Sequence, residues 1–123
     1  MKYINTSKGP KTVGHYSQAV ITGDFIFCSG QIGKDPKTDQ LVEGIENQTL
    51  QVLNNIEIVL KAAGSDSQHI VKTTVYVKNI ADFSKINDVY ASFFGNHKPA
   101  RATVEVSNLP KGALIEIEAV ALV

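Results

Sequence analysis

The chain has 123 residues, of which 43% are hydrophobic and 20% are charged. This length and composition are typical of one globular domain, which we expect to span residues 1–123. Twelve basic residues balance twelve acidic ones, so the formal net charge is zero. A neutral chain is not expected to bind nucleic acid or an anionic membrane, and a small metabolite or a protein partner is favoured instead.

The cysteine content and the hydropathy pattern bear on location. Cys28 is the only cysteine, so neither an intrachain disulfide nor a cysteine-based zinc cluster can form. The first ten residues, MKYINTSKGP, lack the apolar core of a signal peptide, and no apolar run approaches the roughly 20 residues that cross a bilayer. We therefore expect a cytoplasmic protein.

The first third of the chain is predicted to hold three strands. A short strand near residues 3–5 precedes a loop with Gly9, Pro10 and Gly14. The turn residues Thr22–Asp24 separate QAVI from FIFCSG and predict a hairpin. The segment GKDPKTDQLVEG, residues 33–44, then predicts a turn-rich connection.

Two helices and one intervening strand are predicted next. Residues 43–63 carry apolar side chains at three- and four-residue intervals, and Gly64 suits the end of a helix. Residues 70–78 alternate as a strand, with Val71, Thr73, Val75 and Val77 on one side. A second helix is predicted over residues 81–94, with Asp82 as a possible N-cap and Gly95 as the stop.

Two further strands, residues 101–107 and 114–122, complete the order βββαβαββ. This order predicts an α+β fold in which one mixed sheet carries both helices on one face. The last strand places apolar residues on both faces, because Leu114, Val120 and Leu122 alternate with Ile115 and Ile117. Two helices cannot cover both faces, so we expect self-association into a closed oligomer.

Arg101 is a candidate binding residue in the strand KPARATVEV. Its side chain shares a face with Thr103 and Glu105. A strand-end arginine is commonly a solvated or ion-paired residue, but a guanidinium can also grip the carboxylate of a keto or imino acid. Composition and spacing leave both interpretations open.

Glu116 and Glu118 lie two residues apart on one face of the last strand. One of them is a candidate base or water-positioning group, and the alternative is an exposed or ion-paired carboxylate.

Polar side chains also gather at strand ends, because the segments Tyr16 to Gln18 and Cys28 to Gln31 carry hydroxyls and amides there. Cys28 itself suits a core position. His15, His69 and His97 lack metal-site spacing, and the chain has neither a nucleophile elbow nor a glycine-rich phosphate loop, so no metal or cofactor is predicted.

The segments GHYSQAV, CSGQIG, INDVYASFF, KPARATVEV and LPKGALIEIEA together resemble the RidA/YjgF family of reactive-intermediate deaminases. The resemblance runs from about residue 3 to the C-terminus. It implies a fold like that of the small trimeric chorismate mutase, with three subunits around a central barrel and sites between subunits.

The resemblance also implies an activity. Such family members hydrolyse 2-iminobutanoate and 2-iminopropanoate to 2-keto acids and ammonia, which protects pyridoxal-phosphate enzymes, and they need no cofactor. Carried onto this chain, the catalytic residues are Arg101 for the substrate carboxylate, Glu116 for the water, and Tyr16 and Ser29 for the imine nitrogen. Asn87, Gly30 and Thr103 are the further substrate-binding positions that the resemblance implies.

Three positions depart from the family pattern, and two other functions stay open. His15 and Gly33 stand where the pattern has proline, and Thr103 stands where it often has cysteine.

One alternative to the deaminase function is a non-catalytic module that binds a keto acid or another small carboxylate and regulates a partner. The other is a ribonuclease or translation inhibitor, against which the neutral charge and the lack of an aromatic and basic stripe argue.

Overall fold

One six-stranded mixed sheet forms the body of the protein in this computed structural model, which describes residues 1–123. The strand order is β1-β2-β3-β8-β6-β7, and only the β6–β7 pair is parallel. The strands are β1 (Lys2–Ile4), β2 (Ala19–Thr22), β3 (Phe25–Ile32), β6 (Ile70–Val77), β7 (Ala100–Glu105) and β8 (Ile115–Leu122).

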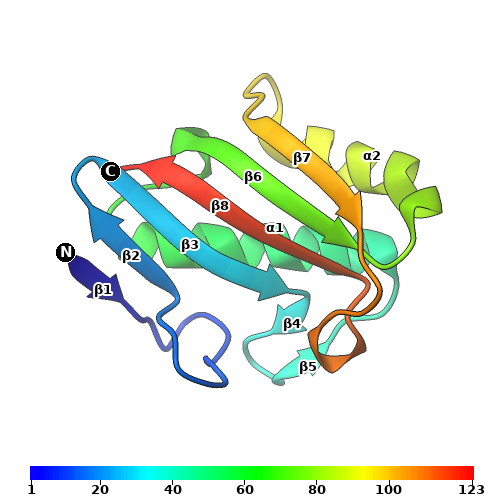
Figure 1. Ribbon diagram of the computed structural model, residues 1–123, viewed down its shortest axis with the longest axis horizontal. Helices are drawn as coiled ribbons and strands as arrows, with labels where there is room; N and C mark the ends of the chain where they lie inside the picture. The colour runs from blue at the N-terminus through cyan, green and yellow to red at the C-terminus, as the bar shows by residue number, and fades with distance from the viewer.

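Both α-helices cover the same face of this sheet (Figure 1). Helix α1 (Ile45–Ala62) ends next to Gly64, whose φ of 85° is the left-handed conformation that glycine tolerates. Helix α2 (Phe83–Phe94) ends at Gly95 in the same region of φ. The apolar stripes of the two helices pack on Ile115 and Ile117 of β8 to form the core. The predicted fold class, a mixed sheet with two helices on one face, is confirmed.

The turn-rich segment after β3 contains structure that the sequence pattern did not predict. Strands β4 (Lys34–Asp35) and β5 (Gln40–Leu41) form a separate two-stranded hairpin. The fully buried Asn55 of α1 donates hydrogen bonds to the carbonyls of Ile32 and Lys34, at 3.1 and 2.9 Å. This amide therefore fixes the path of the chain from β3 into the hairpin.

We expect Asn55→Leu to lower the free energy of unfolding by about 2–4 kcal/mol, because it leaves one buried and one partly buried carbonyl oxygen without this donor. Urea denaturation measures the change. Asn54→Leu is the matched control, since Asn54 is exposed on the same helix. Equal stability of the two variants would contradict the role assigned to Asn55.

Two local predictions were wrong. Val71 is 38% exposed and Ile70 is buried in its place, because the pairing of β6 with β8 shifts register between Ile70 and Lys72. Asp82 makes no side-chain cap; instead Asn79 accepts a hydrogen bond from the Ala81 amide and caps the short 3₁₀ turn η2 (Ile80–Asp82) that precedes α2. The remaining 3₁₀ turns are η1 (Ser67–His69) and η3 (Pro110–Gly112).

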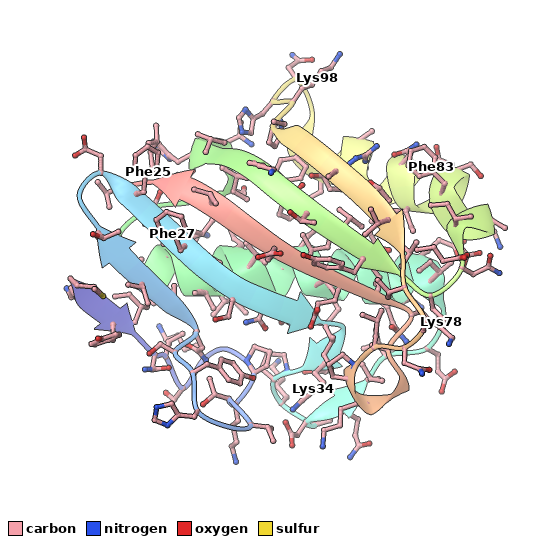
Figure 2. All side chains as sticks on the ribbon, viewed as in Figure 1. Phe25, Phe27, Lys34, Lys78, Phe83 and Lys98 are labelled. Atoms are coloured by element: carbon pink, nitrogen blue, oxygen red, sulfur yellow. The ribbon has the colours of Figure 1, made fainter.

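The sheet has two unlike faces. The helix face carries the core, whereas the open face, which we define by Phe25, Phe27, Tyr76, Val104 and Leu122, is not covered within the chain. Phe25 and Phe27 lie on this open face in Figure 2, and they are 45% and 47% exposed. An apolar sheet face of this kind is what a neighbouring subunit would cover.

Candidate functional site

A β-bulge brings Gly30 beside Glu116. Between the pairs Cys28–Ala119 and Gln31–Ile117, β3 has two residues where β8 has one. A Cβ on Gly30 would lie 2.9 Å from Cδ of Glu116. Glycine at this position therefore leaves the room that the carboxylate of Glu116 occupies on the open face.

Glu116 is a half-buried acid with a perturbed titration. Burial raises the pKa of Glu116 above its ordinary value, and the negative charge of Glu118 raises it further. Glu118 accepts a hydrogen bond from the hydroxyl of Tyr76. Of the two acids that the sequence left open, Glu116 is thus the carboxylate without a side-chain partner, and it suits a proton acceptor.

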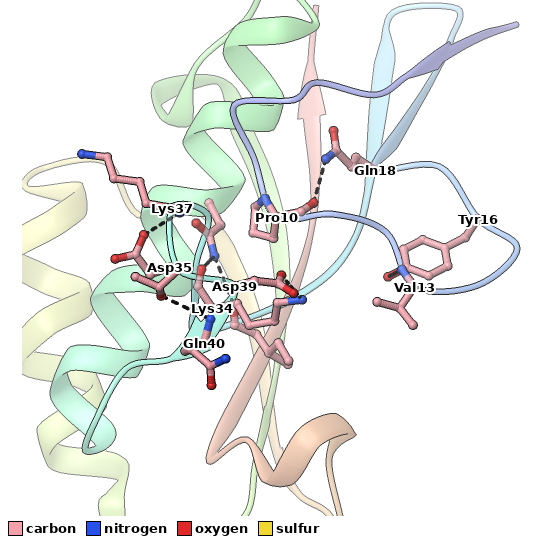
Figure 3. Close-up of polar contacts among 12 residues, drawn as sticks. Pro10, Val13, Tyr16, Gln18, Lys34, Asp35, Lys37, Asp39 and Gln40 are labelled. Carbon is pink, nitrogen blue, oxygen red and sulfur yellow. Dashed lines mark hydrogen bonds and ion pairs between the residues drawn. The ribbon is translucent and has the colours of Figure 1, made fainter.

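Tyr16 and Ser29 lie near Glu116 on a loop and strand that Gln18 holds in place. The buried Gln18 amide donates to the Pro10 carbonyl (Figure 3). It also donates to the Thr6 carbonyl, and its oxygen accepts from the Thr6 amide. The Ser29 hydroxyl donates to the Ser17 carbonyl at 2.6 Å, which leaves its lone pairs free to accept. Tyr16, whose hydroxyl accepts from the Val13 amide, remains 49% exposed.

Tyr16, Ser29 and Glu116 line the same cavity of about 440 Å³, which we call the Glu116 cavity. Its wall includes four of the residues expected from the sequence, namely Tyr16, Ser29, Gly30 and Glu116. The turn η3 and the chain near Lys34 close its other side. The volume is within the about 300–1,000 Å³ of small-molecule sites.

Arg101 belongs to a different cavity. It pairs in register with Thr73 of β6, which in turn pairs with the buried Ala119, so its side chain lies on the helix face. Its guanidinium carbon is 4.9 Å from the ring centroid of Tyr90 and 5.3 Å from that of Phe83. No carboxylate of the chain pairs with it. The two rings orient a guanidinium that is free to bind an external anion.

A hydrogen bond to Thr73 of β6 holds the ring of Tyr90 in place. The hydroxyl of Tyr90 and that of Thr73 share this buried hydrogen bond of 2.6 Å. Asn87, one turn earlier on α2, lines the same cavity of about 480 Å³, which we call the Arg101 cavity. Thr103 follows Arg101 on the same strand face, and its buried hydroxyl has no hydrogen-bond partner. Three of the expected residues therefore gather on this side.

The structure separates the two groups of expected site residues. The Glu116 cavity and the Arg101 cavity share no lining residue, and Glu116 and Arg101 lie on opposite faces of the sheet. One chain therefore does not bring the acid and the arginine together.

Cys28 and His69, two further candidates from the sequence, lie outside both cavities, and His97 contacts another part of the chain. Cys28 is buried, and burial raises the pKa of its thiol to about 12, which makes it a poor nucleophile. His69 pairs with Asp66, and His97 contacts the Ile70 carbonyl. No group of three or more His, Cys, Asp or Glu side chains is arranged to hold a metal ion. Neither helix combines the length and the apolar character needed to span a bilayer.

Residues 6–123 match the protein family described as endoribonuclease L-PSP. The chain belongs to this family, which is also known as RidA/YjgF. A RutC family protein of Pyrococcus horikoshii is 55% identical over 119 residues, which cover 96% of this chain and 94% of the relative. The human protein named 2-iminobutanoate/2-iminopropanoate deaminase is 48% identical over 122 residues, which cover 98% of this chain and 89% of that protein.

Solved structures of RidA/YjgF proteins have the same fold. The crystal structure of Escherichia coli TdcF with bound serine superposes with a TM-score of 0.96 at 37% identity, covering 100% of this chain and 99% of that one. The family that the sequence motifs indicated and the fold of the single chain are both confirmed, and the trimer stays a prediction.

The sequence reasoning missed the residues that orient Arg101. Phe83 and Tyr90 are seven residues apart, which puts them on one face of α2, but that spacing by itself is typical of an ordinary apolar stripe. The structure also explains one departure from the RidA/YjgF pattern. A Cβ on Gly33 would lie 2.9 Å from the backbone Cα of Gln48, so α1 approaches the bend between β3 and β4 too closely for proline.

Proposed function

We propose that this protein hydrolyses small 2-imino acids, such as 2-iminobutanoate and 2-iminopropanoate, to 2-keto acids and ammonia. The activity would remove reactive imines released by pyridoxal-phosphate enzymes. The name of the human relative supports this reaction. The observation that carries the proposal is the pair of half-sites, one with an unpaired guanidinium and one with a carboxylate of raised pKa.

The complete site forms between two copies of the chain in a homotrimer. The apolar open face needs a cover, and covering it with a second copy brings foreign residues toward Glu116. Arg101 of that second copy would supply the positive charge that the Glu116 cavity needs to hold a substrate carboxylate. A closed ring of three copies satisfies every subunit in the same way.

The proposed chemistry is addition followed by elimination. Arg101 holds the carboxylate with two parallel hydrogen bonds, and Asn87, Gly30 and Thr103 line the substrate. Glu116 accepts a proton from water as the water oxygen attacks the C=N carbon, and it then gives this proton to the nitrogen, which yields a carbinolamine. Ser29 and Tyr16 hold that nitrogen. Glu116 next accepts the hydroxyl proton of the carbinolamine and passes it to the nitrogen, so that the C–N bond breaks, ammonia leaves and the C=O bond of the keto acid forms.

The test couples a threonine dehydratase to the purified protein and follows the loss of semicarbazide-trapped 2-iminobutanoate. Acceleration over buffer is the expected result. Light scattering measures the assembly in parallel, and a stable monomer would contradict the intersubunit site. A trimer that does not accelerate imine loss would contradict the proposed activity but not the proposed assembly.

We expect Gly30→Ala to reduce kcat for imine hydrolysis by about 10²-fold, because its new Cβ displaces the Glu116 carboxylate by an ångström or so. Stability should change little, since the displaced group is the end of a flexible side chain and the backbone of Gly30 has no left-handed φ. Ammonia release and thermal denaturation give the two readouts. Gly33→Ala is the contrasting variant, and we expect it to lose stability because its Cβ meets the backbone of α1.

A second candidate function is a sensor of small carboxylates. It is favoured by the crystal structure of E. coli TdcF with bound serine, because serine is a small molecule with a carboxylate. Calorimetric binding of 2-ketobutyrate without any imine turnover would support this function. RNA cleavage that persists in Arg101→Ala at low salt would instead support the activity that the family description names.

A further inference from the structure

The Glu116 cavity has a basic lining that the proposed hydrolysis of 2-iminobutanoate does not use. Three lysines, Lys11, Lys34 and Lys111, line the cavity, and Glu116 is the only acid that does so. Neither Lys11 nor Lys111 forms an ion pair. The lysines come from three separate segments, the loop before β2, strand β4 and the turn η3.

Lys34 differs from an ordinary surface lysine because it is only 7% exposed. Its Nζ lies 2.7 Å from Oδ1 of Asp39 across the β4–β5 hairpin (Figure 3). Lysines are almost never buried unless they are paired, so Asp39 is what retains this charge in the cavity wall.

The other two lysines converge on the same carboxylate. The Lys34 hydrogen bond lowers the pKa of Asp39, and the charges of Lys34, Lys11 and Lys111 lower it further. The charges of three lysines therefore act on one carboxylate, and Lys34 alone is in contact with it. The pKa of Glu116, by contrast, is raised by burial and by Glu118, without an opposing effect from any lysine. Lys11 and Lys111 are exposed whereas Lys34 is buried, so two of the three ammonium groups are open to solvent at the cavity and the third belongs to its wall.

We propose that Lys11, Lys34 and Lys111 form a subsite for a second acidic group, so that the preferred substrates are 2-imino dicarboxylic acids. This inference rests on the proposed function. Arg101 of a second copy holds the 2-carboxylate, Glu116 serves the C=N carbon, and the side-chain carboxylate extends to the lysines. A cavity of about 440 Å³ has room for such a substrate beyond the four carbons of 2-iminobutanoate. Enzymes that oxidise acidic amino acids would supply these imines.

The experiment compares three imines under identical trapping with semicarbazide. Threonine dehydratase generates 2-iminobutanoate, and flavin-dependent oxidation of aspartate or glutamate, with catalase present, generates 2-iminosuccinate or 2-iminoglutarate. We expect at least one dicarboxylic imine to have a kcat/KM about tenfold above that of 2-iminobutanoate, and raised salt to reduce this ratio.

Two charge-removing variants test the lysines. Lys11→Gln combined with Lys111→Asn removes two charges, and asparagine tolerates the φ of 60° at position 111. Lys34→Met removes the buried charge with little change in shape. We expect each variant to lower the dicarboxylate-to-monocarboxylate ratio about tenfold. Lys37→Met is the matched control, since Lys37 is exposed on the same hairpin and does not line the cavity.

Calorimetric binding of the products, oxaloacetate and 2-ketobutyrate, gives a readout that does not depend on turnover. Tighter binding of oxaloacetate that both lysine variants abolish would support the subsite. Equal binding of the two acids, or a ratio that the variants leave unchanged, would overturn it while leaving imine hydrolysis intact. Absence of turnover for every imine would overturn the proposed function, and the binding ratio would still decide the subsite.

Discussion

Arg101→Ala is expected to lower kcat/KM for 2-iminobutanoate by about 10²–10³-fold, because it removes the partner of the substrate carboxylate. The guanidinium has no acid within the chain, so its loss leaves no unpaired charge behind. Circular dichroism should therefore show an unchanged fold. Trapping of the residual imine measures the effect.

Arg101→Lys separates charge from geometry. Lysine retains the positive charge but loses the planar fork and the stacking on Tyr90 and Phe83. We expect it to recover only part of the lost activity. Full recovery would mean that Arg101 contributes charge alone and that the two rings have no orienting role.

Glu116→Gln is the second large effect, with kcat expected to fall by about 10²–10⁴-fold because the proton acceptor is lost. The same variant should be more stable than the wild type at neutral pH. The pKa of Glu116 is raised in the folded state, so folding favours its protonated form, and that contribution is lost as pH rises through the raised value. Thermal denaturation at pH 7 measures this gain, and a lower Tm would contradict the burial argument.

The pH profile of kcat/KM tests the same residue independently. Activity should fall on the acid side as Glu116 becomes protonated, at a pH above the ordinary range of a glutamate. Glu118→Gln removes the neighbouring negative charge, so it should lower the pKa of Glu116 and move this limb to lower pH. A limb that does not move would assign the titration to another group.

Mixing the two inactive variants tests where the site forms. If Arg101 and Glu116 act from different copies, a 1:1 co-refolded mixture of Arg101→Ala and Glu116→Gln should recover about a quarter of wild-type activity, since half of the sites receive each intact residue at random. A site within one chain would recover nothing, because every chain then carries one defect. Separately refolded variants combined afterwards provide the control.

The sequence by itself determined the periodic elements and indicated the candidate site residues. Both helices were found because their apolar side chains recur at helical spacing, and Gly64 and Gly95 mark their ends. The two-sided apolar character of the last strand already indicated a face in need of a cover. The family resemblance located Arg101, Glu116, Tyr16 and Ser29, which local patterns alone left among ordinary alternatives.

Only the tertiary structure decided how these residues are distributed. Alternation along a strand separates its two faces, but which face the helices cover depends on pairing between distant segments. The β6–β7 register assigns Arg101 to the helix face, and the β6–β8 register assigns Glu116 to the open face. The bulge that fits Gly30 against Glu116, and the packing that buries Lys34 beside Asp39, likewise arise from contacts that no local pattern encodes.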